Sequence, residues 1–192
     1  MTDEAEGKQE LRKSFLALRK TIAAEHPELE REIGKVLVAW LESRPEIRAV
    51  GLYMPIRNEP NLVPDFLKWL AEDSARSLAL PFIEAGAMHY CRWRPGEAME
   101  PGAFRILVPK SRVVIWPDLV IGPCVGFTSA GYRLGYGGGW FDRMLSTVRP
   151  RPETMAVSYE VGCADGRMEP EPHDVAFDWI ATERGVRRAA IQ

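Results

Sequence analysis

The sequence lacks the features that define several protein classes. Its three cysteines, Cys91, Cys124 and Cys163, form no C-x-x-C pair, so neither a zinc site nor a disulfide framework is predicted, and reduced thiols are expected. No apolar run reaches membrane-spanning length, and residues 1–9 are polar and acidic, unlike a secretory signal. The net charge of −2 argues against a nucleic-acid-binding surface. We therefore expect a cytoplasmic protein without membrane or nucleic-acid partners.

The common phosphate-binding signatures are also missing. There is no G-x-x-x-x-G-K-[ST] sequence and no G-x-G-x-x-G followed by a ribose-binding acid, which excludes a P-loop and makes a Rossmann site unexpected. What is present is ordinary for a globular chain: 192 residues, of which 46% are hydrophobic and 27% charged. One domain covering residues 1–192 is the simplest expectation.

Helices and short apolar strands alternate along the chain. The first predicted helix, residues 8–22, carries an apolar stripe of Leu11, Phe15, Leu18 and Ile22. Other helices are predicted at 28–43, from Asn61 as N-cap to about 72, and after residue 140. Strands are predicted at 49–54, 78–83, 88–93, 119–127, 154–159 and 179–182, with 94–116 irregular and 165–174 a polar loop. This order indicates an α/β layer fold with a mostly parallel sheet.

A glycine-rich segment follows the predicted strand at 119–127. Four glycines fall between Gly135 and Gly139, and a short helix follows. A strand, glycine loop and helix can present backbone N–H groups to an anion. Arg133 and Arg143 flank the loop and can bind phosphate, and Asp142 can hold a phosphate-bound Mg²⁺. A turn that only lets strand and helix pack closely would leave the same pattern, so the spacing alone does not decide.

The loop after the first strand is expected beside this segment. In open α/β sheets, ligands bind outside the carboxyl ends of the strands. This rule places Tyr53, Met54 and Glu59 near the glycines.

The glycine segment Arg133 to Arg143, RLGYGGGWFDR, resembles the signature of the 5-formyltetrahydrofolate cyclo-ligase family, also called methenyltetrahydrofolate synthetase. Weaker landmarks of that family occur in the same order along nearly the whole chain. They are K-x-x-L-R at 8–12, Tyr53-Met54-Pro55 with Glu59, Leu80-Pro81, His173-Asp174 and Thr182-Glu183.

The resemblance implies a three-layer α/β sandwich related to CoA transferases and sugar-phosphate isomerases. It also implies ATP-dependent cyclisation of 5-formyltetrahydrofolate to 5,10-methenyltetrahydrofolate, with release of ADP and phosphate. Because the formyl oxygen leaves poorly, its phosphorylation would activate it for attack by N10. Such a protein needs positioning and charge neutralisation rather than a covalent nucleophile. The implied cofactors are ATP and Mg²⁺, and we expect a monomer.

The family's site residues carry over by position. Arg133 and Asp142 are implied to be catalytic, Asp142 and Asp174 to hold Mg²⁺, and Met54, Glu59, Gly137, Gly138, Gly139 and Trp140 to contact the folate. ATP contacts are implied for Lys8, Gln9, Glu10, Leu11 and Arg12 and for Arg133, Leu134, Gly135, Tyr136, Gly137, Gly138, Gly139, Trp140 and Phe141. From spacing alone, Lys8 and Arg12 would be a solvated helix face, Met54 core, and the acids surface charges.

Three departures from the family pattern stand out. Trp140-Phe141 replaces the usual Tyr-Tyr, Pro60-Asn61-Leu62 follows Glu59, and Val108 stands where relatives often carry Glu. The altered loop after Glu59 permits an alternative, a paralogue that keeps the ATP site but uses another formylated or folate-like metabolite. A non-enzymatic nucleotide-binding protein is a more distant alternative.

Overall fold

The fold is built on a central seven-stranded sheet. The computed structural model describes residues 3–190 of the chain, with side chains from residue 7. The sheet order is β11-β10-β9-β6-β1-β2-β3, in which β2, β1, β6, β9 and β10 run parallel and the two edge strands, β3 and β11, run antiparallel. The strands are β1 (Ala49–Gly51), β2 (Ser77–Glu84), β3 (Ala87–Trp93), β6 (Leu119–Pro123), β9 (Glu153–Val157), β10 (Trp179–Thr182) and β11 (Gly185–Arg188). The predicted, mostly parallel sheet is confirmed.

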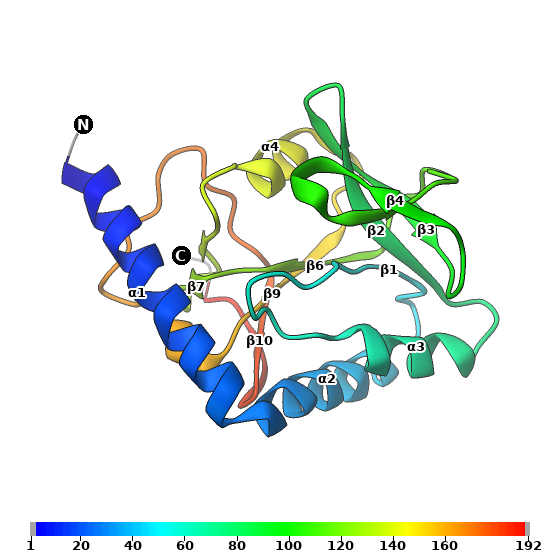
Figure 1. Cartoon of the computed structure of the whole chain (residues 1–192), viewed down its shortest axis with the longest axis horizontal. Helices are drawn as coiled ribbons and strands as arrows, with labels where there is room; N and C mark the ends of the chain where they lie inside the picture. Colours follow the sequence, from blue (N-terminus) through cyan, green and yellow to red (C-terminus); the bar gives the residue numbers. More distant parts are fainter. Residues whose placement is uncertain (1–2, 191–192) are drawn as a thin grey trace.

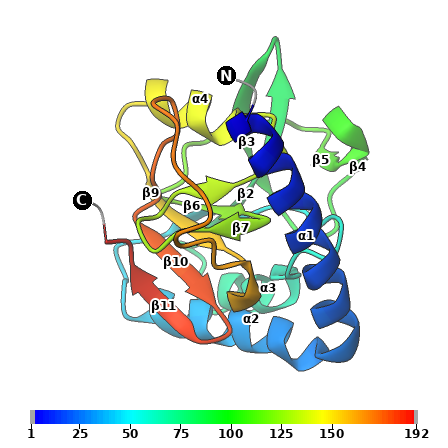
Figure 2. The ribbon, with the colours of Figure 1, turned by 90° about the vertical axis from the view of Figure 1, so that its left-hand side faces the viewer.

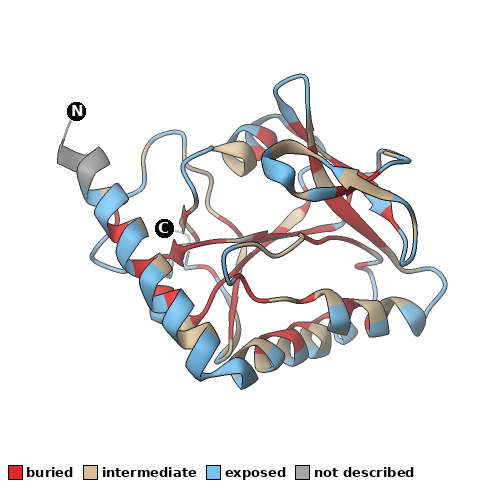
Figure 3. Ribbon diagram, in the orientation of Figure 1, coloured by how far each residue is buried: buried red, intermediate tan, exposed pale blue. Residues whose placement is uncertain are grey.

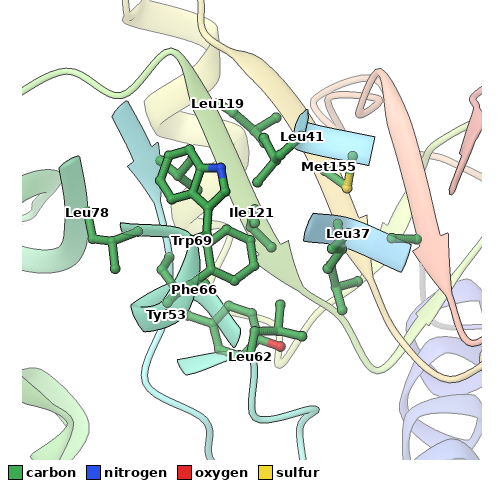
Figure 4. Packing of buried hydrophobic residues seen from close by; sticks show 14 of the residues in the cluster. Leu37, Leu41, Tyr53, Leu62, Phe66, Trp69, Leu78, Leu119, Ile121 and Met155 are labelled. Atoms are coloured by element: carbon green, nitrogen blue, oxygen red, sulfur yellow. The ribbon is translucent and has the colours of Figure 1, made fainter. Parts of the chain in front are cut away.

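Helices cover both faces of this sheet. α2 (Pro27–Glu42) and α3 (Val63–Ala71) lie below it in Figure 1, and α4 (Trp140–Thr147) lies above. Successive strand residues point to opposite faces of the sheet. Leu119 and Ile121 therefore join the core between the sheet and helices α2 and α3, whereas Val120 joins the core between the sheet and α4. The central strands are therefore buried on both faces (Figure 3). Figure 4 shows the larger core, in which Leu37, Leu41, Phe66 and Trp69 from the helices meet Leu78, Leu119, Ile121 and Met155 from the strands.

The N-terminal helix α1 (Asp3–Glu25) crosses the side of the molecule where β7 and the long loops lie (Figures 1 and 2). Leu11 and Phe15 pack inward as predicted, but the next inward residue is Arg19, with 2% of its surface exposed. The prediction that Leu18 continues the apolar stripe is wrong, because Leu18 is 42% exposed. Residues 11, 15 and 19 follow an i, i+4 row, which is equally compatible with helical spacing.

The predicted strand at 119–127 is two strands. β6 ends at Pro123, and the chain then leaves the main sheet to form β7 (Gly126–Phe127), which pairs with β8 (Arg133–Leu134). Val125 donates its N–H to the Leu134 carbonyl (2.8 Å), so the backbone finds new partners after the break. This small hairpin leads directly into the glycine segment.

Other differences concern short elements. The segment 94–116, predicted to be irregular, contains β4 (Met99–Pro101), a 3₁₀ turn η1 (Ala103–Arg105) and β5 (Leu107–Pro109), while β11 and η2 (Glu160–Gly162) were not predicted. The N-cap position of α3 is Leu62 rather than Asn61, although the Asn61 Oδ1 accepts the Val63 N–H (3.2 Å). Residues 165–174 form a loop, as predicted. None of the helices within residues 3–190 is both long and apolar enough to cross a membrane.

Candidate active site

The candidate site lies at the carboxyl ends of β1 and β6. The parallel strands have the order 2-1-3-4-5 when counted along the chain, so their winding direction changes between β1 and β6. Ligands bind in the crevice at such a switch point. The loop after β1 contains Glu59, and the loop after β6 leads through β7 and β8 to the glycine segment, defined as Gly135 to Gly139. The Tyr136 hydroxyl donates to the Glu59 Oε1 (2.9 Å), which confirms that the two loops meet as predicted.

The glycine segment is shaped by two left-handed residues. Gly137 has φ of 91° and Gly139, which caps the start of α4, has φ of 60°. Such values favour glycine and turn the chain sharply into the helix. Open space surrounds the position where Gly135 would carry a Cβ, whereas a Cβ on Gly138 would lie 2.7 Å from the Trp140 indole. The segment therefore exposes backbone on one side and packs against Trp140 on the other.

Cationic side chains of α1 reach this segment. The Arg12 Nε donates to the Gly135 carbonyl (2.6 Å), and the Lys8 Nζ donates to Glu171 Oε1 (2.6 Å) and Asp174 Oδ2 (3.3 Å). Lys8 and Arg12 thus share a helix face directed at the candidate site rather than at solvent, which favours the binding interpretation over a solvated face.

Other residues of the two predicted ATP segments point elsewhere. Gln9 and Glu10 are exposed, whereas Leu11 and Leu134 are buried together in the core between α1 and β7. The Phe141 ring packs edge-on against Phe177 (5.8 Å between centroids). For the buried Leu11 and Leu134, contact with a nucleotide would have to come from the backbone.

The buried Arg133 side chain forms an ion pair with the partly buried Asp142. The Arg133 Nη2 donates to Asp142 Oδ1 (2.9 Å), its Nη1 donates to the Val175 carbonyl (3.0 Å), and its guanidinium lies 3.8 Å from the centroid of the Phe177 ring. Burial lowers the pKa of Arg133, and the facing Asp142 opposes that shift. Asp142 Oδ1 also accepts the Val175 N–H (3.1 Å). The pair therefore fastens α4 to the 171–175 loop.

The carboxylates of Asp142 and Asp174 are compatible with a magnesium ion whose other ligands are water and phosphate oxygens. Within the described residues, no group of three His, Cys, Asp or Glu side chains is placed to hold a metal. Asp142 Oδ2 takes part in none of the described hydrogen bonds, and Asp174 Oδ2 accepts the Glu171 N–H (2.8 Å), leaving Oδ1 toward the exposed His173 (3.9 Å). Mg²⁺ commonly binds one or two carboxylates and completes its octahedron with water and phosphate oxygens. Two carboxylates are consistent with that pattern.

The substrate-side residues differ in exposure. Glu59 is 4% exposed; its Oε2 accepts the Ile56 N–H (2.9 Å), and burial raises its pKa. Met54 is half-buried and packs against the core beneath the sheet. Trp140 is half-buried beside the exposed Phe104 (6.4 Å between ring centroids) and under the Arg143 guanidinium (4.4 Å).

The structure accounts for Val108 at a position where relatives often carry Glu. Val108 is 2% exposed and packs with Phe82 and Cys91 in a small apolar cluster. A carboxylate in that cluster would lose its hydration, which is costly, whereas Val108 fills the space with apolar atoms.

Sequence reasoning missed two residues of this region. Arg19 donates to the Tyr136 hydroxyl, and Glu171 binds Lys8. The signal for Arg19 was its position three helical turns after Lys8, on the row that also carries Phe15. Glu171 had no signal, because the polar loop 165–174 contains several acids and nothing in the sequence selects one.

Comparisons with known proteins agree with one another. The profile of the 5-formyltetrahydrofolate cyclo-ligase family matches residues 4–183. The 5-formyltetrahydrofolate cyclo-ligase of Mycoplasma pneumoniae is 28% identical over 177 residues, covering 92% of this chain and 98% of its own. A solved 5,10-methenyltetrahydrofolate synthetase from M. pneumoniae has a TM-score of 0.75 at 26% identity, covering 92% and 98% of the two chains. The NMR structure of Aquifex aeolicus 5,10-methenyltetrahydrofolate synthetase has a TM-score of 0.73 at 32% identity, covering 95% and 93%.

Proposed function

Because this chain belongs to the 5-formyltetrahydrofolate cyclo-ligase family, we propose that the site at β1 and β6 converts 5-formyltetrahydrofolate to 5,10-methenyltetrahydrofolate at the expense of ATP. The observation that carries the assignment of the site is the convergence of α1 on the glycine segment, through the Arg12–Gly135 hydrogen bond. This contact brings cations and exposed backbone to one place, as a polyphosphate requires.

The proposed reaction has two steps. The formyl oxygen attacks the γ-phosphorus of ATP, and the bond to the β,γ-bridging oxygen breaks to release ADP. N10 then attacks the formyl carbon and gives up its proton, the ring closes, and the activated oxygen departs with its phosphoryl group as inorganic phosphate, which takes up that proton. Both steps depend on alignment and on neutralising phosphoryl charge.

The chain's own residues supply these needs as follows. Lys8 and Arg12 bind phosphate oxygens together with the backbone of the glycine segment. Asp142 and Asp174 hold Mg²⁺, which neutralises charge on the phosphates when bound. Arg133 is too deeply buried to reach a phosphate without rearrangement, so we assign it the positioning of Asp142 in place of the direct catalytic contact expected from the resemblance.

On the folate side, Glu59 offers a carboxylate to N–H donors of the substrate, while Met54, Trp140 and the glycines 137–139 supply contact surface. Glu59 is nearly enclosed by Tyr136 and its own loop. We therefore propose that the loop after β1 and the glycine segment move slightly when the substrate binds. This movement exposes part of the Glu59 carboxylate to the substrate.

The direct test is the absorbance of the methenyl product, followed with purified protein and 5-formyltetrahydrofolate. We expect product only when both ATP and Mg²⁺ are present. Equal product formation without ATP would contradict phosphoryl activation. Absence of product together with consumption of another formyl compound would favour the paralogue.

We also propose that residues 1–192 act as one cyclo-ligase domain, as a monomer in the cytoplasm. The family match over 4–183 and the free thiols of Cys91, Cys124 and Cys163 support this setting. Light scattering of the purified protein measures the oligomeric state directly. Residues 1–2 and 191–192 of the proposed domain lie outside the described structure.

A further inference from the structure

Arg19 is a buried cation with no direct counter-ion among the residues that the structure describes. Its Nη1 donates to the Cys124 carbonyl (3.3 Å), at the carboxyl end of β6, and its Nη2 donates to the Tyr136 hydroxyl. Its Nε, also buried, has no hydrogen-bond partner among the described residues. Among the ion pairs of those residues, none includes Arg19. A buried charge of this kind is costly, so a compensating group should lie nearby.

That group is Glu59, reached through Tyr136. The Tyr136 hydroxyl accepts from Arg19 and donates to the Glu59 Oε1 (2.9 Å). The direction of these bonds is fixed, because a guanidinium can only donate and an ionised carboxylate can only accept. Glu59 in turn accepts the Ile56 N–H through Oε2. One hydrogen-bonded chain thus joins α1, the glycine segment and the loop after β1.

We propose that Arg19 is a positioning residue that couples nucleotide binding to substrate binding through the Arg19–Tyr136–Glu59 chain. The proposal rests on the proposed function, which assigns the glycine segment to ATP and Glu59 to the folate. A nucleotide held by Arg12 and the glycine segment fixes Tyr136, and Tyr136 orients Glu59 for the substrate. Each ligand then favours the same arrangement of the Arg19–Tyr136–Glu59 hydrogen bonds, so binding of one ligand raises the protein's affinity for the other.

The electrostatic surroundings of Glu59 support this role. It faces Arg19 from α1, Tyr136 from the glycine segment, Arg57 from its own loop, and Tyr53 and Cys124 after β1 and β6. Burial raises the pKa of Glu59, and the two arginines oppose that shift. Loss of Arg19 therefore leaves a carboxyl that protonates at higher pH, so the loss of substrate affinity on acidification should begin at higher pH than in the wild type.

The test compares the Kd of 5-formyltetrahydrofolate with and without the non-hydrolysable analogue adenylyl imidodiphosphate and Mg²⁺, by titration calorimetry. We expect the analogue to tighten wild-type binding by about fivefold or more, the lower end of usual allosteric coupling. In Arg19→Met and in Tyr136→Phe this factor should fall to about 1, because either change breaks the hydrogen-bonded chain. The double variant should lose nothing further, because both changes interrupt the same chain.

Arg57→Met is the matched control. Arg57 lies over the same Tyr136 ring (5.1 Å to its centroid) and faces the same carboxylate, but it is exposed and makes none of the hydrogen bonds of the chain. Its removal should leave the coupling factor at the wild-type value.

The outcomes separate the two proposals. If the wild-type protein binds neither ligand, the proposed function fails. If it binds both with a factor of 1, or if Arg19→Met and Tyr136→Phe keep the wild-type factor, the coupling role is overturned. Should Arg19→Met fail to fold, Tyr136→Phe decides, because it keeps the ring and removes only the hydroxyl. If Arg19 were merely structural, its loss would lower the melting temperature but would leave the pH at which substrate affinity falls on acidification unchanged.

Discussion

At the scale of single residues, only one oxygen of Asp142 is engaged in the described hydrogen bonds, and the other is the proposed Mg²⁺ ligand. Oδ1 accepts from Arg133 and from the Val175 N–H, so Asp142→Asn can keep both hydrogen bonds while removing the counter-charge of a buried arginine. We expect this to lower the free energy of unfolding by about 1–3 kcal/mol. Loss of the charged Oδ2 should also raise the Mg²⁺ concentration for half-maximal turnover by about tenfold, equivalent to about 1.4 kcal/mol.

Asp118→Asn is the control for this prediction. The Asp118 Oδ2 accepts the N–H groups of Arg48 and Ala49 at the start of β1, the end opposite to the candidate site. It should cost stability without changing the Mg²⁺ titration. If Asp142→Asn also left that titration unchanged, the carboxylate would be structural only.

Gly135 offers a test of close ligand approach that does not disturb the free protein. A Cβ there meets open space, and the φ of Gly135 is not among the positive values of the segment. We expect Gly135→Ala to retain its melting temperature but to weaken ATP binding by about tenfold or more, because the methyl group would occupy the place of the phosphates. Normal ATP affinity would show that the nucleotide does not approach Gly135.

Gly138→Val should act differently. Its side chain would collide with the indole of Trp140, which is only half-buried, so we expect the indole to shift and the fold to persist while ATP binding is lost. Circular dichroism and calorimetry on the same sample distinguish this from unfolding. A folded variant with wild-type ATP affinity would remove this half of the glycine segment from the site.

Glu59 should give the folded protein a characteristic response to pH. Because burial raises its pKa above the unfolded value, the folded state binds the proton more tightly, and Glu59 contributes stability that is lost as pH rises from about 4.5 through the folded pKa. The neutral Glu59→Gln avoids that loss. Its stability relative to wild type, measured by urea unfolding between pH 4 and 8, should therefore increase with pH. A constant difference would mean that Glu59 titrates alike in both states.

At the scale of elements, α1 carries the cationic part of the site. Arg12→Ala should weaken ATP binding by about 1.5–3 kcal/mol, because it removes a charge-assisted donor and frees the Gly135 carbonyl. Lys8→Ala should cost less, since Lys8 lies near the end of the helix and already neutralises Glu171 and Asp174. Lys13→Ala, exposed on another face of α1, is the control. Equal ATP KM values in all three variants would show that Lys8 and Arg12 form a solvated helix face and do not bind ATP.

Elements whose signal is local could be predicted from the sequence, and those that depend on partners could not. The apolar period of α2 and the runs of β2, β3 and β9 are properties of contiguous residues. The break between β6 and β7 is not, because it depends on β8 as a new partner for Val125. The burial of Arg19 was likewise hidden, since its acceptors on Tyr136 and at Cys124 come from more than a hundred residues later.

At the scale of the whole molecule, the sheet topology predicted where the candidate site lies better than any single motif did. The rule that ligands bind at the carboxyl ends of parallel strands placed Glu59 beside the glycines, and the Tyr136–Glu59 hydrogen bond confirms that placement. What the rule could not supply was which acids pair with which cations. That depends on side-chain packing, as the burial of Arg133 against Asp142 demonstrates.

The contacts of α1 with residues much later in the sequence also limit the order in which parts of the protein can fold during synthesis. Lys8 and its partner Glu171 are 163 residues apart in sequence, so the first helix leaves the ribosome long before its binding partners exist. At about 5–20 residues per second, the interval is roughly 8 to 33 seconds. For most of that time the apolar row of Leu11 and Phe15 has no cover from β7 and β8, which are synthesised before Glu171. A nascent chain of this protein therefore offers an amphipathic N-terminal helix to chaperones before it can offer a nucleotide site to ATP.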